Sequence, residues 1–382
     1  MMTRKNISIF CSIFFFLFII NVSFAQQIIN ASITHDGLQR SYILYVPENY
    51  SQDQPSPLLF NFHGYSSNAI QQMSYGDFRP IADTAVFLIV HPLGTEDDLG
   101  NLHWNVGWGG STVDDVGFTD ALIDSLELDY NIDENRIYST GMSNGGFMSY
   151  KLACDLSLRF TAIASVTGTM TEGQTENCNC QHPTPILEIH GTADDVVPYN
   201  GNYMFSSIPE VISYWVDYNN CNSSPIINNL PDIDPDDGST VTHYLYENGN
   251  NGATVEHFKV INGTHTWPGS NFDLGGTNYD IDASVEIWKF LSKFKLDELI
   301  NNTNTHEIAQ TSEIIVYPNP FNSYINIKKE SAKQERYQIV SVDGIPLING
   351  VLYSHNQKID LNKLPNGIYI LKISDQRFMI TK

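Results

Sequence analysis

The chain has 382 residues and a formal net charge of −23, with 43 acidic residues against 20 lysines and arginines. This length is enough for one large α/β domain and a smaller second domain. Such acidity argues against partners that are nucleic acids or anionic membrane surfaces, and the sequence has no basic stripe or phosphate-cradling loop. Neutral substrates are favoured, although the charge also suits a protein that must stay soluble outside the cell.

The first 25 residues have the order of features that is typical of a secretory signal peptide. Arg4 and Lys5 precede an apolar run over residues 13–20, and a small-x-small cleavage site ends at Ala25. The apolar run is short for a membrane span, and no second run follows. We therefore expect no membrane span in the mature chain, with an uncleaved anchor as the alternative.

The central part of the chain alternates strand and helix patterns. A helix is expected where Phe118, Leu122, Leu126 and Tyr130 fall on one face, with acidic residues just before it. Further helices are expected after the Gly-rich turn near residue 141 and over residues 282–294. Strands are expected over residues 40–46, 57–62, 86–90, 136–140, 162–166, 186–189 and 255–261. This alternation predicts a mostly parallel sheet with helices on both faces and active residues beyond the carboxyl ends of its strands.

The last 70 residues have a different pattern. A polar stretch over residues 301–312 is expected to be a linker between an α/β domain at 26–300 and a C-terminal domain at 313–382. Short alternating runs separated by turns such as Asp343-Gly344 predict a small all-β sandwich in the second domain. Residues 26–312 carry a net charge of −28, from nine basic and 37 acidic residues, whereas the C-terminal 70 residues carry +3. The two segments thus look like separate domains.

Four cysteines remain after removal of the signal peptide: Cys154, Cys178, Cys180 and Cys221. An even number in an oxidising compartment suggests two disulfides. A bond between Cys178 and Cys180 would be strained, so we expect each of them to pair with Cys154 or Cys221. The spacing does not fit a zinc site, and no metal is expected.

The segment from Gly141 to Gly146 contains a G-x-S-x-G motif between an expected strand and an expected helix. In that context the motif predicts a sharp turn that exposes Ser143 as a nucleophile. Glycine is expected at 141 and 145 because a Cβ would collide with the neighbouring backbone. The alternative is a plain turn between strand and helix.

A nucleophilic serine needs a histidine base and a carboxylate that orients it. The strand over 186–189 leads into Asp194 and Asp195, either of which could be the acid. The strand over 255–261 leads into His265, which we expect to be the base. Hydrolysis also needs donors for the oxyanion, and we expect the backbone N–H groups of Tyr65 and Asn144 to supply them.

These motifs resemble secreted esterases of the poly(3-hydroxybutyrate) depolymerase group and the related feruloyl and acetyl-xylan esterases of carbohydrate esterase family one. The resemblance covers residues 33 to 296 and rests on four segments: His63-Gly64-Tyr65, the elbow over 138–146, the acid loop over 190–199, and His265-Thr266-Trp267-Pro268. It implies an α/β-hydrolase fold. The expected serine mechanism needs no cofactor. The resemblance also implies that Asp194, three residues after a glycine, is the acid rather than Asp195.

The C-terminal domain resembles the sorting domain of type IX secretion. The resemblance rests on Tyr317-Pro318-Asn319-Pro320 near its start and on the segment 364–369 near its end. It implies export through the type IX machinery to the cell surface or beyond it. A carbohydrate-binding module is the competing interpretation.

Aromatic residues on the loops suit a sugar ring or a phenolic acid. We expect substrate contacts from His63, Trp108, Tyr199 and Trp267, with core packing as the alternative for each. The expected substrate is a polymer-bound ester, with feruloyl or acetyl esters of xylan ahead of poly(3-hydroxybutyrate). A peptidase and a catalytically inactive polysaccharide-binding protein are the rival interpretations. The Asp-rich segment 232–238 only loosely matches a calcium loop and is expected to be a solvated insertion.

Overall fold

A computed structural model describes residues 26–300 and, in the C-terminal part, residues 314–329, 335–341, 346–353, 356–365, 367–373 and 376–382. The expected signal peptide and linker lie outside these ranges. The described residues fall into two compact units, 26–300 and 314–382. Across the ranges given above, no helix is both long enough and apolar enough to cross a membrane.

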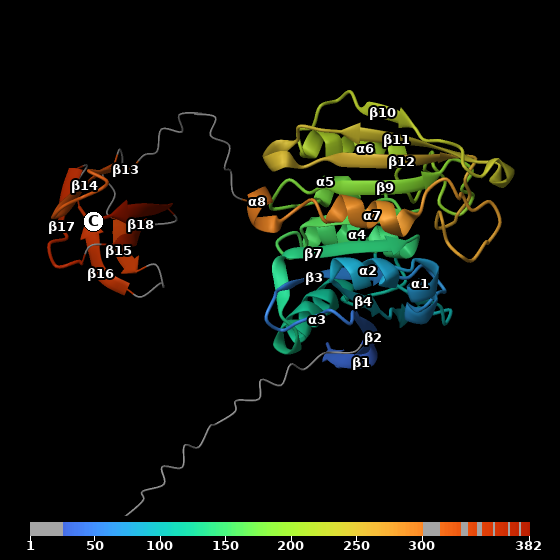
Figure 1. The fold of residues 1–382 in the computed structure, drawn as a ribbon, viewed down its shortest axis with the longest axis horizontal. Helices are drawn as coiled ribbons and strands as arrows, with labels where there is room; N and C mark the ends of the chain where they lie inside the picture. The colour runs from blue at the N-terminus through green and yellow to red at the C-terminus, as the bar shows by residue number, and fades with distance from the viewer. Residues whose placement is uncertain are drawn as a thin grey trace, which may run out of the picture. The chain divides into compact units, whose positions relative to one another are not determined.

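A ten-stranded sheet runs through the N-terminal unit (Figure 1). Its six central strands, β4, β3, β7, β8, β9 and β12, are parallel, and the pairs at both edges are antiparallel. The strand order is β1 (Gln27–His35), β2 (Leu38–Val46), β4 (Leu88–Pro92), β3 (Ser56–Phe62), β7 (Ile132–Met142), β8 (Ala162–Val166), β9 (Ile186–Gly191), β12 (Val255–Ile261), β11 (Thr240–Tyr246) and β10 (Ile226–Asn229). The mostly parallel sheet is confirmed, and the unit has the α/β-hydrolase fold.

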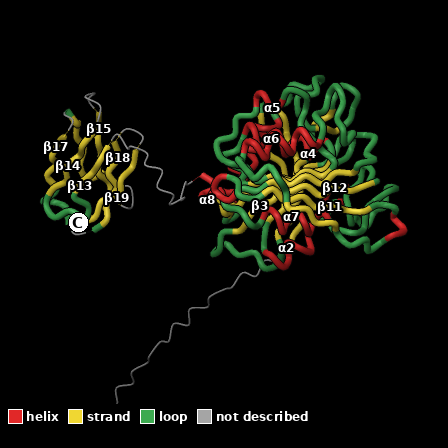
Figure 2. Tube along the Cα trace, turned by 90° about the horizontal axis from the view of Figure 1, so that it is seen from above, coloured by secondary structure: helices red, strands yellow, loops and turns green. Residues whose placement is uncertain are grey.

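Helices cover both faces of this sheet (Figure 2). One face carries α3 (Asp115–Asp129), α4 (Asn144–Asp155) and α6 (Ile208–Tyr218), and the other carries α2 (Arg79–Ala85) and α7 (Ala283–Leu291). Consecutive residues of β3 alternate between the two cores: Leu58 and Phe60 pack with α3 and α4, whereas Leu59 packs with α2 and α7. The shorter elements are α1 (Ala69–Tyr75), α5 (Gln174–Asn177), α8 (Leu296–Ile300) and the hairpin of β5 (Thr95–Glu96) and β6 (Leu102–His103).

The C-terminal unit consists of two antiparallel sheets packed around one core, which confirms the predicted sandwich. One sheet has the order β13 (Ile314–Tyr317), β14 (Tyr324–Lys329), β17 (Asn356–Asp360). The other has the order β16 (Pro346–Leu352), β15 (Glu335–Ser341), β18 (Ile368–Ile373), β19 (Gln376–Thr381). Ile325 and Ile359 of the first sheet and Ile339 and Leu371 of the second lie in the same buried cluster.

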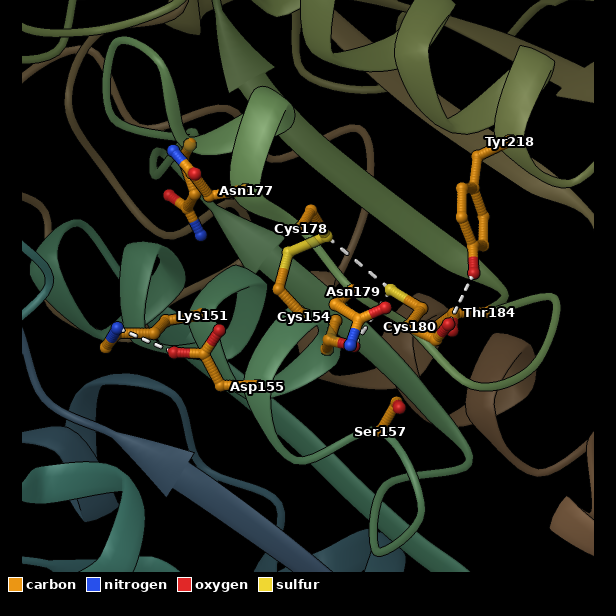
Figure 3. Close-up of a disulfide and its surroundings, with 12 residues drawn as sticks. Lys151, Cys154, Asp155, Ser157, Asn177, Cys178, Asn179, Cys180, Thr184 and Tyr218 are labelled. Carbon is orange, nitrogen blue, oxygen red and sulfur yellow. Dashed lines mark hydrogen bonds and ion pairs between the residues drawn. A yellow bond between two sulfur atoms is a disulfide. The ribbon is translucent and has the colours of Figure 1, made fainter.

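One disulfide joins Cys154, near the end of α4, to Cys178 (Figure 3). The expectation of a second disulfide is wrong for this structure, since Cys180 and Cys221 are free thiols. Each free thiol faces a different backbone carbonyl: Cys180 Sγ lies 3.1 Å from Ala153 O and Cys221 Sγ lies 3.6 Å from Ala253 O. Burial raises the pKa of both thiols to about 11, so neither is a thiolate at neutral pH.

Candidate active site

Ser143 occupies the sharp turn between β7 and α4 that the motif predicts. Its backbone has φ 54° and ψ −121°, a conformation that non-glycine residues rarely adopt. Such backbone strain is concentrated at functional sites. Its N–H donates to Val166 O at the end of β8 over 2.8 Å. The side chain is partly exposed beyond the carboxyl end of the sheet.

Two glycines permit this turn, as the sequence indicates. A Cβ at Gly141 would lie 2.6 Å from both Gly145 C and Phe62 O, and a Cβ at Gly145 would lie 2.2 Å from Phe62 O. Both contacts are with backbone atoms, which cannot rotate away. The turn therefore depends on close approach between β3, β7 and the start of α4.

Asp194 and His265 meet on the loops that follow β9 and β12. Nδ1 of His265 lies 2.7 Å from Oδ2 of Asp194, and the Asp194 side chain is fully buried. Oδ1 of Asp194 accepts the N–H groups of Val196 and Val197 at 2.9 and 2.8 Å. Because Nδ1 of His265 is taken by Asp194, Nε2 is the ring nitrogen left for proton exchange. The neighbouring Asp195 is exposed.

Backbone hydrogen bonds tie the three loops along one edge of the sheet. Ser143 is bonded to the end of β8, and Thr167, just after β8, donates to Ile189 of β9. The acid loop is tied to the loop after β12, which carries His265, by the hydrogen bond from Ala193 N to Gly263 O at 2.9 Å. Within the described residues the Ser143 hydroxyl makes no hydrogen bond.

The loop after β3 lies against the nucleophile. A Cβ at Gly64 would lie 3.4 Å from the Ser143 Cβ, which places the Tyr65 backbone beside the elbow. Among the described residues, the N–H of Tyr65 has no backbone acceptor, and the N–H of Asn144 is one of the first in α4, which have no acceptor within the helix. Both groups are thus available as the expected oxyanion donors.

The expected substrate residue His63 is instead wholly buried under this loop. Its Nε2 accepts the N–H of Gly94 at 3.0 Å, so Nδ1 carries the proton and donates to Gly64 O at 2.8 Å. Burial lowers the pKa of His63 to about 4, which keeps the ring neutral at neutral pH. His63 therefore holds the loop after β3 in place from the protein interior.

The Asn144 side chain has a similar positioning role. Its Oδ1 accepts the Trp104 N–H at 2.6 Å and its Nδ2 donates to Trp104 O at 3.1 Å. The indole of Trp104 in turn donates to His63 O at 2.9 Å. The first residue of α4 and the loop after β3 are thereby connected through one buried tryptophan.

The three aromatic residues expected at the pocket rim lie in three different places. Trp108 and Tyr65 line a cavity of about 400 Å³ together with Leu99 and His103. Trp267 is only 1% exposed and packs against Phe78, so it belongs to the core. Tyr199 is half-buried and stacks on His257 of β12, whose Nε2 lies 3.1 Å from the Tyr199 hydroxyl. Of the three, Trp108 is the one placed beside the elbow.

The segment 232–238, which is expected to be a solvated insertion, is mostly exposed. Hydrogen bonds to residues 279 and 280 hold it in place. Asp280 Oδ1 accepts the Ile233 N–H at 2.7 Å, and Asp237 Oδ2 accepts the Tyr279 N–H at 2.8 Å. These two carboxylates serve as backbone acceptors that anchor the loop.

Two buried residues beside the candidate acid were not among the expected site residues. Glu188 and His190, on β9, have no exposed side-chain surface, and Nε2 of His190 lies 3.4 Å from Oδ2 of Asp194. The signal was present, because a glutamate two residues before a histidine inside an apolar strand places both side chains on one face.

Comparisons with known proteins agree with the two-unit organisation. Residues 116–223 match the model of the phospholipase/carboxylesterase family. Residues 315–382 match the secretion system C-terminal sorting domain. An α/β-hydrolase unit with a segment that matches a carboxylesterase family is thus followed by a unit that matches a sorting domain, and the chain is exported to the cell surface or the extracellular space.

Curated relatives are similar to part of the chain. A bifunctional acetylxylan esterase/xylanase of Neocallimastix patriciarum is 27% identical over 270 residues, which are 70% of this chain and 35% of that protein. A probable feruloyl esterase C of Aspergillus flavus is 33% identical over 173 residues, which are 44% of this chain and 59% of that protein. The chain therefore matches less than two thirds of either relative.

Among solved structures, an acetyl xylan esterase from Aspergillus awamori superimposes with a TM-score of 0.48 at 12% identity. That comparison covers 69% of this chain and 98% of the other.

Proposed function

We propose that the N-terminal unit is a serine esterase that hydrolyses feruloyl or acetyl esters on xylan. The hydrogen bond between Asp194 and His265, on loops tied to the Ser143 elbow, carries this proposal. Ser143 attacks the ester carbonyl after His265 accepts its proton through Nε2. His265 then returns the proton to the leaving alcohol, and water repeats the cycle on the acyl-enzyme. Asp194 keeps the His265 proton on Nδ1.

Negative charge develops on the carbonyl oxygen during each attack. The N–H groups of Tyr65 and Asn144 stabilise it, each lowering the barrier by about 3 kcal/mol. Both donors are held in place by His63 and Trp104, whose hydrogen bonds are satisfied within the protein. The site therefore needs little rearrangement as the charge appears.

Two further observations support the assignment of xylan esters as the substrate. The cavity beside Tyr65 has the size of small-molecule sites and offers the Tyr65 and Trp108 rings to a phenolic acid or a sugar. The relatives named acetylxylan esterase and feruloyl esterase favour the same ester class over poly(3-hydroxybutyrate). Export suits a substrate too large to enter a cell.

A product assay on three polymers tests this proposal. Feruloylated arabinoxylan, acetylated xylan and poly(3-hydroxybutyrate) granules are each incubated with the wild-type chain and with Ser143→Ala. We expect ferulate or acetate release that falls by a factor of at least about 10⁴ in the variant. Release of hydroxybutyrate alone would contradict the xylan assignment. Equal activity in the variant would contradict the nucleophile, and no turnover of any polymer would favour a binding protein.

A further inference from the structure

A chain of buried polar side chains runs from α4 to the candidate acid. The Tyr150 hydroxyl donates to Glu188 Oε2 at 2.8 Å, and Glu188 Oε1 lies 3.0 Å from His190 Nδ1. His190 Nε2 then lies 2.8 Å from Val197 O and 3.4 Å from Asp194 Oδ2. Nothing in the proposed reaction uses Glu188 or His190. Burying two ionisable groups is costly unless they are paired, so their arrangement calls for a role.

The partners of His190 fix which of its nitrogens carries a proton. Nε2 faces a carbonyl oxygen and a carboxylate oxygen, which are both acceptors, so Nε2 must bear hydrogen. Nδ1 shares a second proton with the Glu188 carboxyl group. Burial alone lowers the pKa of His190, but the hydrogen bond and charge of Glu188, with the charge of Asp194, raise it above the usual value. The Nε2–H donor is therefore kept at neutral pH.

We propose that His190, oriented by Glu188, is a positioning residue that holds the Asp194 carboxylate and its loop in place for His265. This proposal rests on the proposed function. It extends the acid–base pair to a series in which Glu188, His190 and Asp194 are buried and His265, at the end, is partly exposed. His190 acts through Asp194 and touches no substrate.

The hydrogen bonds of the acid loop support this role. Asp194 Oδ1 is fixed by two backbone N–H groups, whereas Oδ2 faces the two histidines His265 and His190. His190 also binds Val197 O, so it connects β9 to the same loop turn that supplies the N–H of Val197. Loss of its donor would free both the loop carbonyl and one side of the carboxylate.

The other polar groups around the pair do not supply a competing charge. His257 on β12 bonds Glu188 O through Nδ1 at 3.0 Å, and burial lowers its pKa to about 3, so it is neutral. Burial raises the pKa of Tyr150 well above its usual value, and burial raises that of Tyr199, so both phenols stay protonated. Lys259 lies over the Tyr199 ring, 5.1 Å from its centroid. His190 is thus the side-chain donor that faces Asp194 Oδ2 beside His265.

A pH profile distinguishes this role from simple packing. Catalysis needs neutral His265, so kcat/KM falls at low pH. The His190 N–H draws negative charge away from the side of Asp194 that faces His265. Without it, Asp194 stabilises the His265 imidazolium more strongly. The acid limb of kcat/KM then moves to higher pH.

Two substitutions at His190 separate its two nitrogens. The amide nitrogen of His190→Gln can take the place of Nε2, whereas that of His190→Asn takes the place of Nδ1 and reaches neither Val197 nor Asp194. We expect His190→Asn to lower kcat by roughly 10- to 100-fold, the range known for outer partners of metal-bound histidines, with KM unchanged within about twofold. We expect His190→Gln to recover most of kcat and the wild-type acid limb.

His182→Asn is the matched control. His182 is buried and bonds backbone carbonyls on both ring nitrogens, at Pro183 O and Ser157 O, but it lies before β9 and away from the acid loop. It should lose stability without a change in the acid limb. All variants are assayed on a soluble nitrophenyl ester, with thermal unfolding followed in parallel.

The outcomes of the test are distinct. Equal kcat and equal acid limbs in wild type, His190→Asn and His190→Gln would overturn the positioning role, as would identical losses in the two variants. If His190→Asn does not fold, Glu188→Gln decides: it should lower kcat with KM unchanged, and wild-type kcat would overturn the proposal. Failure of Ser143→Ala to abolish activity would instead overturn the proposed function itself.

Discussion

Two adjacent aspartates follow β9, and their surroundings separate their roles. The Asp194 side chain is buried, accepts two backbone N–H groups and meets His265, whereas Asp195 is exposed. A carboxylate held in this way can orient an imidazole, because it cannot turn aside to water. A solvated neighbour one residue further along has no such constraint.

Substitution of each aspartate by asparagine tests this difference. We expect Asp194→Asn to lower kcat by about 10⁴-fold, because an amide favours the wrong tautomer of His265. We expect Asp195→Asn to keep kcat within about twofold. Steady-state kinetics on a soluble ester measure both. A larger loss in Asp195→Asn would show that the acid is assigned one residue too early.

For single residues, the sequence predicts the positions of polar side chains better than it predicts which aromatic side chains line a pocket. Ser143, Asp194 and His265 follow β7, β9 and β12 at one edge of the sheet, and the expected hydrogen bond between Asp194 and His265 is present there. Trp267 and His63 lie within the same motifs but point into the core. Side-chain direction at a loop is set by packing with segments distant in sequence, such as Phe78, which a local pattern does not contain.

The elbow depends on how closely β3 approaches the start of α4. Phe62 O, at the end of β3, lies where a Cβ at Gly145 would have to be, at 2.2 Å. The same strand end leads into Gly64 and Tyr65, so the packing of β3 on α4 sets the distance between the proposed oxyanion donors and the nucleophile. Here strand packing and catalytic geometry depend on the same contact.

Alanine substitutions at Gly145 and Gly64 compare a Cβ that would clash with backbone and a Cβ that has room. We expect Gly145→Ala to cost about 3 kcal/mol or more of unfolding free energy, because the clash is with backbone. Gly64→Ala places its Cβ at 3.4 Å from the Ser143 Cβ, an ordinary contact, and should cost less than about 1 kcal/mol. Denaturant unfolding compares the two. Equal costs would contradict this account of the elbow.

Helices α3 and α7 were predicted from the sequence, whereas helix α6 and the edge strand β10 were not. The expected helix after Asp114 is α3, and the expected C-terminal helix is α7, with Asp282 as its N-cap. Helix α6 was missed although Ser207 and Glu210 form a capping box that the sequence displays. Strand β10 is exposed along its whole length and has no alternation to reveal it. Its position depends on pairing with β11.

At the scale of the whole chain, charge composition alone separates the two units. The acidic segment folds as the α/β-hydrolase unit, and the mildly basic segment folds as the sandwich that matches a sorting domain. Cysteine pairing was not predictable in the same way. Four cysteines allow three pairings, and in the structure Cys180 and Cys221 face separate carbonyls instead of each other.

Covalent labelling tests the central claim that one serine of the α/β-hydrolase unit is an activated nucleophile. The full chain is treated with a fluorophosphonate, and its peptides are mapped by mass spectrometry. The account predicts one label per chain, on Ser143, with none in the C-terminal unit and none in Ser143→Ala. A label on another residue, or an unlabelled Ser143 in a folded chain, would contradict it.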